Sequence, residues 1–128
     1  MITCHLRYVI DASKISEFEA YCRMWLGLIP KFGGVHHGYL LPSEGASNIA
    51  LGSFSFESFA EYEQYRIQSL LDADCQVAFK FAKETKCFIS YERSFFRPVL
   101  PPTAPSTLPA NGATKCSTPN RPSPKTRR

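Results

Sequence analysis

Residues 2–10 read ITCHLRYVI, with an apolar side chain at every even-numbered position. This alternation predicts a β-strand with one apolar face and one partly polar face. Apolar residues then recur at steps of three and four from Ile15 to Phe32, which is the spacing of one face of a helix. Asp11 and Ser13 supply side-chain oxygens that suit the start of that helix. The chain is therefore expected to open with a strand followed by a helix.

A hairpin is predicted after the first helix. Residues 35–41 and 49–56 are rich in aliphatic and aromatic residues, as strands are. The connection between them, residues 42–48, reads PSEGASN, and such small and polar residues are typical of turns. Two antiparallel strands joined by a short loop are therefore expected.

Two helix starts and a last strand complete the pattern. Ser58 and Glu61 have the S-x-x-E spacing of a capping box, which predicts a helix start. Asp72 and Asp74 interrupt the helical spacing that follows and suit the start of another short helix. The long aromatic segment 85–96 predicts the fourth strand. The βαββαβ order indicates an α+β, ferredoxin-like fold, in which helices cover one face of a four-stranded antiparallel sheet.

The third and fourth predicted strands carry more aromatic residues than two helices are expected to cover. They are Phe54, Phe56, Phe88, Tyr91, Phe95 and Phe96. A large exposed apolar surface on a small domain usually marks an interface. We therefore expect the uncovered sheet face to pair with a second copy, which gives a homodimeric α+β barrel.

The composition changes near residue 98. Residues 1–97 hold 10 Lys and Arg against 11 Asp and Glu, whereas residues 98–128 hold five Lys and Arg, no Asp or Glu, and eight of the ten prolines. Such a segment has too little apolar material to offset its ordering entropy. A domain of residues 1–99 and a disordered tail of residues 100–128 are therefore expected. Because the basic charge belongs to the tail, a domain built around a basic surface for nucleic acid is excluded.

Other classes of protein are also excluded by the sequence. The longest apolar run, residues 24–29, is far shorter than the roughly 20 residues that a membrane span needs. The start of the chain has no signal-peptide pattern. The five cysteines form no C-x-x-C pair, which argues against zinc and redox sites. We expect a cytoplasmic protein with no cofactor and no membrane span.

Five segments of the chain resemble the NIPSNAP family. They are GGVHHGYLLPSEG at 33–45, YERSFFRPV at 91–99, FSF at 54–56, YEQYR at 62–66 and ITCHLRY at 2–8. The likeness covers about the first 99 residues and implies a ferredoxin-like subunit that pairs into a dimeric α+β barrel. It implies no single activity: some dimeric-barrel relatives are cofactor-free or haem-dependent enzymes, others have no assigned chemistry, and the animal members are linked to mitochondria, vesicle traffic and mitophagy signalling.

Two histidines stand side by side in the second predicted strand. His36 and His37 would point to opposite faces of a regular strand, so they could bind one metal together only across a bulge. One of them with His5 and Glu92 would form a two-histidine, one-carboxylate metal site. We favour the alternative, in which one histidine bonds a backbone carbonyl and the other faces solvent, so no metal site is expected.

A polar cluster on the central strands is the sharper candidate for chemistry. One histidine of the 36–37 pair, beside Tyr39, Glu92 and Arg93, would act as a general base if a carboxylate raised its pKa. Arg7, Arg66 or Arg93 would then hold an anionic group of the substrate. The alternative is a structural ion pair that fixes the sheet or the dimer, and we favour it.

The sequence therefore predicts a site only as a set of candidates for the cavity or the dimer seam. The set is His5, Arg7, His36, His37, Tyr39, Glu92 and Arg93. No catalytic residue is assigned. The favoured function is a small-molecule-binding or scaffold module rather than an enzyme. The alternatives are an enzyme of the dimeric-barrel type, a monooxygenase or isomerase with a cavity histidine, and a protein-interaction adaptor.

Overall fold

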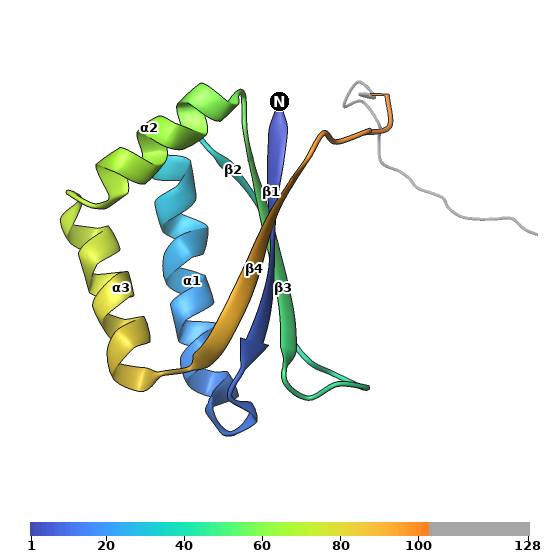
Figure 1. The fold of residues 1–128 in the computed structure, drawn as a ribbon, viewed down its shortest axis with the longest axis vertical. Coiled ribbons are helices and arrows are strands. Elements are labelled where there is room, and N and C mark those ends of the chain that lie inside the picture. Colours follow the sequence, from blue (N-terminus) through green and yellow to red (C-terminus); the bar gives the residue numbers. More distant parts are fainter. Residues whose placement is uncertain (103–128) are drawn as a thin grey trace, which may run out of the picture. The chain divides into compact units, whose positions relative to one another are not determined.

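The computed structural model describes residues 1–102, and all of the helices and strands lie within Met1–Pro98. Their order is β1 (Ile2–Ile10), a 3₁₀ turn (Ala12–Lys14), α1 (Ile15–Lys31), β2 (Val35–Leu40), β3 (Ile49–Phe56), α2 (Phe59–Ser69), α3 (Ala73–Thr85) and β4 (Phe88–Phe96). The strands form one antiparallel sheet in the order β2–β3–β1–β4. The predicted α+β, ferredoxin-like fold is confirmed (Figure 1).

The predicted capping residues start the helical segments as expected. Asp11, Ser58 and Asp72 each accept a hydrogen bond from a backbone N–H two or three residues later, at 2.9, 3.2 and 3.0 Å. These bonds satisfy N–H groups that have no partner within the helix. Asp72 also lies 2.7 Å from Lys31 Nζ, so its carboxylate links the start of α3 to the end of α1.

The last strand begins later than the sequence pattern predicted, and α3 is longer. Thr85 is the final residue of α3, where its hydroxyl donates to the Phe81 carbonyl at 2.8 Å. Lys86 then adopts a left-handed conformation with φ of 53°, which ends the helix. The strand itself starts at Phe88, so the prediction of strand at residues 85–87 is wrong.

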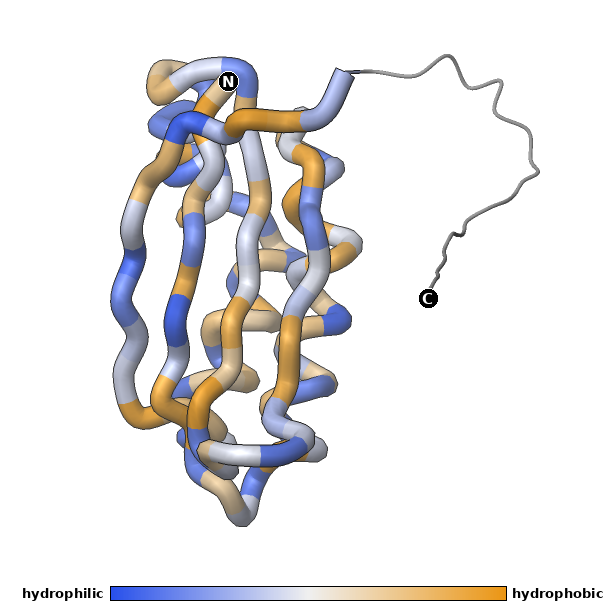
Figure 2. The backbone as a smooth tube through the Cα atoms, turned by 90° about the vertical axis from the view of Figure 1, so that its right-hand side faces the viewer, coloured by the Kyte–Doolittle hydropathy of each residue, from blue (hydrophilic) through white to orange (hydrophobic). Residues whose placement is uncertain are grey.

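The sheet has one face covered by helices and one without them. α1, α2 and α3 all lie on the same side of the sheet (Figure 1), and Figure 2 views the sheet from the opposite side, with the helices behind it. On β1 the covered face carries Cys4, Leu6, Tyr8 and Ile10, which are buried. The bare face of the same strand carries Thr3, His5, Arg7 and Val9.

Most of the aromatic residues of β3 and β4 lie on the covered face. Paired residues in an antiparallel sheet point to the same side, and the buried residue Cys4 pairs with Phe54 and Phe95. Six aromatic residues of these strands were expected to be more than the helices could cover, and only Phe96 of the six lies on the bare face. The strand register directs the other five toward the helices, but Tyr91 and Phe95 are still 47% and 36% exposed there. The expectation that the helices leave part of this set uncovered is therefore confirmed, although only Phe96 lies on the bare face.

A β-bulge at His37 determines the faces of β2. The pairing with β3 shifts between His36, opposite Phe54, and Gly38, opposite Ser53. Gly38 has φ of 98°, a conformation that glycine adopts readily. Because the bulge inserts one residue, His36 and Tyr39 both reach the covered face, whereas His37 lies on the bare face.

Two remaining expectations concern the membrane and the tail. Within residues 1–102, no helix is long and apolar enough to cross a membrane. The tail predicted for residues 100–128 lies outside the described residues except for its first three positions. Cys4, Cys22, Cys75 and Cys87 are buried and unbonded.

Candidate functional site

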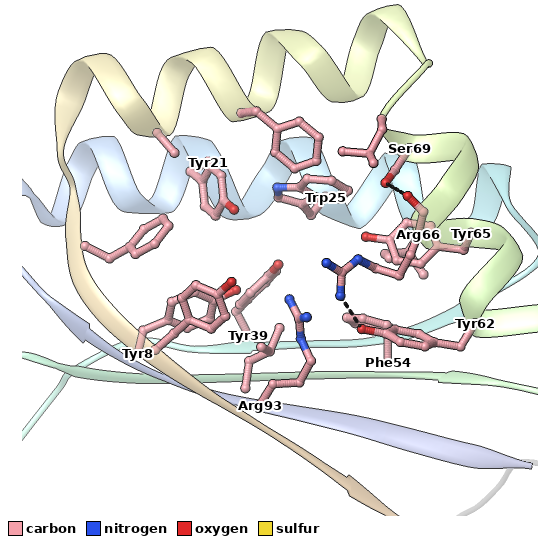
Figure 3. A pocket seen from close by; sticks show the side chains of 17 residues that line it. Tyr8, Tyr21, Trp25, Tyr39, Phe54, Tyr62, Tyr65, Arg66, Ser69 and Arg93 are labelled. Carbon is pink, nitrogen blue, oxygen red and sulfur yellow. Dashed lines mark hydrogen bonds between the residues drawn. The ribbon is translucent and has the colours of Figure 1, made fainter. Parts of the chain in front are cut away.

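A cavity of about 370 Å³ lies between the covered face of the sheet and the helices (Figure 3). Its walls come from all four strands and from α1, α2 and α3. Gly52 of β3 lies beneath the Tyr39 ring, and a Cβ at this position would stand 2.6 Å from two ring carbons. The missing side chain therefore makes room for Tyr39 in the cavity wall.

Tyrosine is the characteristic residue of this cavity. All six tyrosines of the chain line it, and so does the single tryptophan, whereas only three of the ten phenylalanines do. The tyrosines are Tyr8, Tyr21, Tyr39, Tyr62, Tyr65 and Tyr91. A tyrosine combines an apolar ring with a hydroxyl that needs a hydrogen-bond partner when buried. The cavity is thus aromatic but rich in hydrogen-bonding groups.

Two guanidinium groups extend into the same space from different elements. Arg66 comes from α2, and its Nη1 donates to the Tyr62 hydroxyl at 3.0 Å. Arg93 comes from β4, and its guanidinium carbon lies 5.4 Å from the centre of the Tyr91 ring. In Figure 3 the two guanidinium groups point toward one another across the cavity. Arg66 is exposed, whereas Arg93 is half-buried.

These guanidinium groups have no acidic partner among residues 1–102. None of the described residues that line the cavity is Asp, Glu, His or Lys. Burial raises the pKa of Tyr8, Tyr21, Tyr39 and Tyr65 above that of an ordinary phenol. These phenols are therefore neutral at physiological pH, and the net charge of the lining is positive.

The thiol of Cys4 does not neutralise this charge. It lies beside Arg93, whose positive charge favours a thiolate, but burial is the stronger effect and raises the pKa of Cys4 to about 11. A thiol with such a pKa is protonated at physiological pH. Cys4 therefore does not neutralise the positive charge of the Arg93 guanidinium.

Two buried nitrogen atoms within the described part of the chain have no hydrogen-bond partner, Nε1 of Trp25 and Nε of Arg93. Burial raises the pKa of Tyr21 and the nearby Trp25 indole partly offsets this, but their contact falls short of a hydrogen bond. Both nitrogens belong to residues that line the cavity. Neither nitrogen atom is itself accessible to solvent, so neither is open to a group bound in the cavity.

His36 lies next to the cavity but does not line it. Its ring centre is 4.8 Å from that of Tyr39, and its Nδ1 accepts a hydrogen bond from the Gly38 N–H at 2.9 Å. Burial, with a smaller contribution from the neighbouring His37, lowers the pKa of His36 from 6.5 to about 4. A general base was expected to have a pKa raised by a nearby carboxylate, whereas the pKa of this histidine is lowered.

The seven candidate residues are divided between the two faces. Tyr39 and Arg93 line the cavity, with His36 behind Tyr39. Four others belong to the bare face: His5, Arg7, His37 and Glu92. The predicted polar cluster is thus split between opposite sides of the sheet.

The bare face holds a smaller depression and a chain of hydrogen bonds. The depression has a volume of about 160 Å³, and His5 and His37 line it. Ser55 Oγ lies 2.7 Å from both Thr3 Oγ1 and His37 Nε2, which links β1, β3 and β2. Arg7 and Glu92 are paired across β1 and β4. Within residues 1–102, no group of three His, Cys, Asp or Glu residues could hold a metal ion.

Several residues of the cavity were not among the seven candidates. Trp25 belongs to the apolar helical spacing of residues 15–32 and is 6% exposed, and it also lines the cavity. Arg66 was considered as a partner of an anion without being placed. The sequence nevertheless contains a signal for Arg66. It shares one turn of a predicted helix with Tyr62 and Tyr65, so its charged group lies beside two aromatic residues.

Comparisons with known proteins agree on one family. The NIPSNAP family model matches residues 5–101. An uncharacterised NIPSNAP domain protein from Burkholderia xenovorans is 19% identical, with a TM-score of 0.64 over 77% of this chain and 95% of that one. A NIPSNAP family protein from Agrobacterium tumefaciens is 17% identical, with a TM-score of 0.65 over 77% of this chain and 85% of that one.

The fold is also similar to that of a protein with a different description. A putative antibiotic biosynthesis monooxygenase from Nitrosomonas europaea is 9% identical, with a TM-score of 0.60 over 78% of this chain and all of that one. At such identities the likeness shows the fold alone. No curated protein matches the chain.

Proposed function

The chain belongs to the NIPSNAP family, and on that premise we propose that it is a small-molecule-binding protein whose ligand occupies the cavity between sheet and helices. The observation that carries the proposal is the cavity itself, about 370 Å³ in volume and lined by aromatic residues with two guanidinium groups. Ligand sites are typically concave, largely apolar and about 300–1,000 Å³ in volume, with a few polar groups that orient the ligand.

Binding is favoured over catalysis by the chemistry of the lining. A general base needs a pKa near the working pH and a position within reach of the substrate. The described lining has no histidine or carboxylate, and burial lowers the pKa of nearby His36 to about 4. An enzyme of the monooxygenase or isomerase type remains the alternative, supported by the fold it shares with the Nitrosomonas europaea protein.

The test uses a neutral apolar fluorophore, N-phenyl-1-naphthylamine, with the full chain. Its emission is expected to rise on binding, and Trp25, the only tryptophan of the chain, should transfer energy to it. Ala82→Phe places a ring in the cavity wall and should abolish the signal. Val77→Phe, at an exposed position of the same helix, is the matched control and should retain it.

Circular dichroism would establish that both variants are folded. Loss of binding in Ala82→Phe alone supports the cavity as the site. Absence of probe binding to the wild-type chain, or equal binding by both variants, contradicts the proposal.

The bare face of the sheet supports a second part of the proposal, pairing with another copy of the chain. Val35, Leu40 and Phe96 on this face are more than half exposed, and no described helix covers them (Figure 1). Exposed apolar groups of this kind favour association. In the proposed homodimer the two bare faces pack together and leave each helix layer outside.

Native mass spectrometry of the full chain tests this assembly and also detects a co-purifying ligand as extra mass. Leu51→Arg would place a charge in the proposed interface and is expected to give monomers. Val77→Arg on the outer surface of α3 is the control and should remain dimeric. A monomeric wild-type chain would contradict the homodimer without affecting the cavity.

A further inference from the structure

The geometry points to the class of ligand: we propose that the cavity selects a flat aromatic carboxylate, whose anionic group is held by Arg66 and Arg93. This inference rests on the proposed binding function and goes further, because it specifies the charge and shape of the ligand. Three observations carry it: uncompensated charge, two guanidinium groups that face one space, and aromatic walls.

The charge of the cavity favours an anion. The four ion pairs between described residues involve neither Arg66 nor Arg93, and residues 98–128 contain no Asp or Glu. Arg66 is instead bonded to a neutral phenol, and Arg93 lies over an aromatic ring. Burying a positive charge beside apolar groups is costly unless it is paired. A carboxylate between the two guanidinium groups would supply that pairing.

The donors point to the same group. A guanidinium presents its N–H donors in a planar fork that matches a carboxylate, and Arg66 and Arg93 bring two such groups to the cavity. Figure 3 shows Trp25, Arg66 and Arg93 around one space, with the hydroxyl of Tyr39 directed into it. A carboxylate has two oxygens and about four acceptor sites, so one group can accept from guanidinium donors that arrive from α2 and β4.

The walls and the volume specify the rest of the molecule. Tyr8, Tyr39 and Phe54 form part of the sheet side, and Tyr21, Trp25 and Phe79 form part of the helix side. Aromatic rings on both sides favour a flat conjugated ligand that packs by offset stacking or edge contacts. An apolar cavity of roughly 150 Å³ accepts one benzene ring, so about 370 Å³ suits a ligand of about two rings.

The chain contains its own matched control for this inference. Arg7 lies on β1 next to the cavity-lining residue Leu6 but points to the bare face. It carries the same guanidinium as Arg66 and Arg93 and contributes the same charge to the protein. An effect of general electrostatic attraction would therefore be shared by Arg7, whereas a built carboxylate site would not involve it.

The test compares two probes of nearly the same shape, 2-naphthoate and 2-naphthamide, by isothermal titration calorimetry with the full chain. The wild-type protein is expected to bind the anion at least about tenfold more tightly, because charge-assisted hydrogen bonds are about twice as strong as neutral ones. Arg93→Gln and Arg66→Gln should each weaken naphthoate binding, with the larger loss, roughly tenfold or more, for the half-buried Arg93. Arg7→Gln should bind both probes as the wild type does.

The outcomes separate this inference from the function on which it rests. Loss of naphthoate affinity with unchanged naphthamide affinity in the two cavity variants supports the carboxylate site. Equal binding of both probes by the wild type, or an equal loss in Arg7→Gln, overturns the inference but leaves the cavity as a neutral ligand site. Failure of both probes and of the neutral fluorophore to bind overturns the inference together with the proposed function.

Discussion

The two faces of the sheet are built from alternate residues of the same strands, yet they differ in almost every property. On the covered side six tyrosines, one tryptophan and two arginines surround a cavity, and the strands themselves supply Tyr8, Tyr39, Tyr91 and Arg93. The bare face carries histidines, serines, a threonine and an Arg7–Glu92 cross-strand pair among apolar residues. In a two-layer fold the chemistry available to a strand residue therefore depends on which face of the sheet it occupies.

The largest expected effect is the difference in stability between two Phe→Ala variants, one on each face of the sheet. Phe54→Ala removes a covered ring that is 5% exposed and should lower the free energy of unfolding by about 3–5 kcal/mol. Phe96→Ala, on the bare face at 55% exposure, should cost less than about 1 kcal/mol at low protein concentration. Urea denaturation measures both, and similar losses would break the contrast between the faces.

A neighbouring pair in β3 gives the next largest difference. Gly52→Ala puts a Cβ against the Tyr39 ring, which would have to shift, and should destabilise the fold by about 1–3 kcal/mol. Ser53→Ala, one residue later on the bare face, should change stability by less than about 0.5 kcal/mol. If Gly52→Ala were neutral in thermal unfolding, the close packing of Tyr39 on β3 would be disproved.

The adjacent histidines should differ in their effect on pH dependence. Burial lowers the pKa of His36 to about 4, so between pH 6.5 and 4 the unfolded chain binds a proton that the folded chain does not. The free energy of unfolding should therefore fall as pH decreases through this window, by about 1–2 kcal/mol after allowance for partial exposure.

Two variants separate the contribution of His36 from that of its neighbour. His36→Asn keeps an acceptor for the Gly38 N–H and should remove this part of the pH dependence, whereas His37→Asn should retain it. Denaturant titrations at a series of pH values measure the slope. An unchanged slope in His36→Asn would show that other groups cause it.

The smallest expected effect lies within the bare face. Ser55 is 2% exposed, and its hydroxyl joins Thr3 and His37. Ser55→Ala should cost about 1 kcal/mol because it leaves two polar groups without their partner. Ser94→Ala, at an exposed position of the same face, should be neutral within about 0.5 kcal/mol. Equal stability of both variants would mean that the hydrogen-bond chain contributes nothing.

The predicted elements were confirmed where local chemistry specifies them. The alternation of residues 2–10 corresponds to β1, and the oxygens of Asp11, Ser58 and Asp72 cap helical segments as expected. The exception is the start of β4, because residues 85–87 carry no strong helix breaker and the helix continues to Thr85. Such boundaries depend on small differences in local propensity.

The candidate site was predictable only in part. Tyr39 and Arg93 were named and line the cavity, whereas His5 and Glu92 lie on the other face. Histidine and carboxylate attract attention as catalytic groups, but their position depends on strand register. Of the six tyrosines that line the cavity, only Tyr39 was among the seven candidates, because a sequence pattern does not distinguish a packed ring from one that borders a cavity.

The order of strands and helices, the helix starts and the family were all predictable from the amino-acid sequence, because they depend on residues that are neighbours along the chain. The tertiary structure decided which residues share a site. The bulge at His37 places His36 and Tyr39 on one face, and the pairing of β1 with β4 sends Glu92 and Arg93 to opposite sides. The physical reason is that side chains of a strand alternate, so a shift of one residue exchanges the two faces.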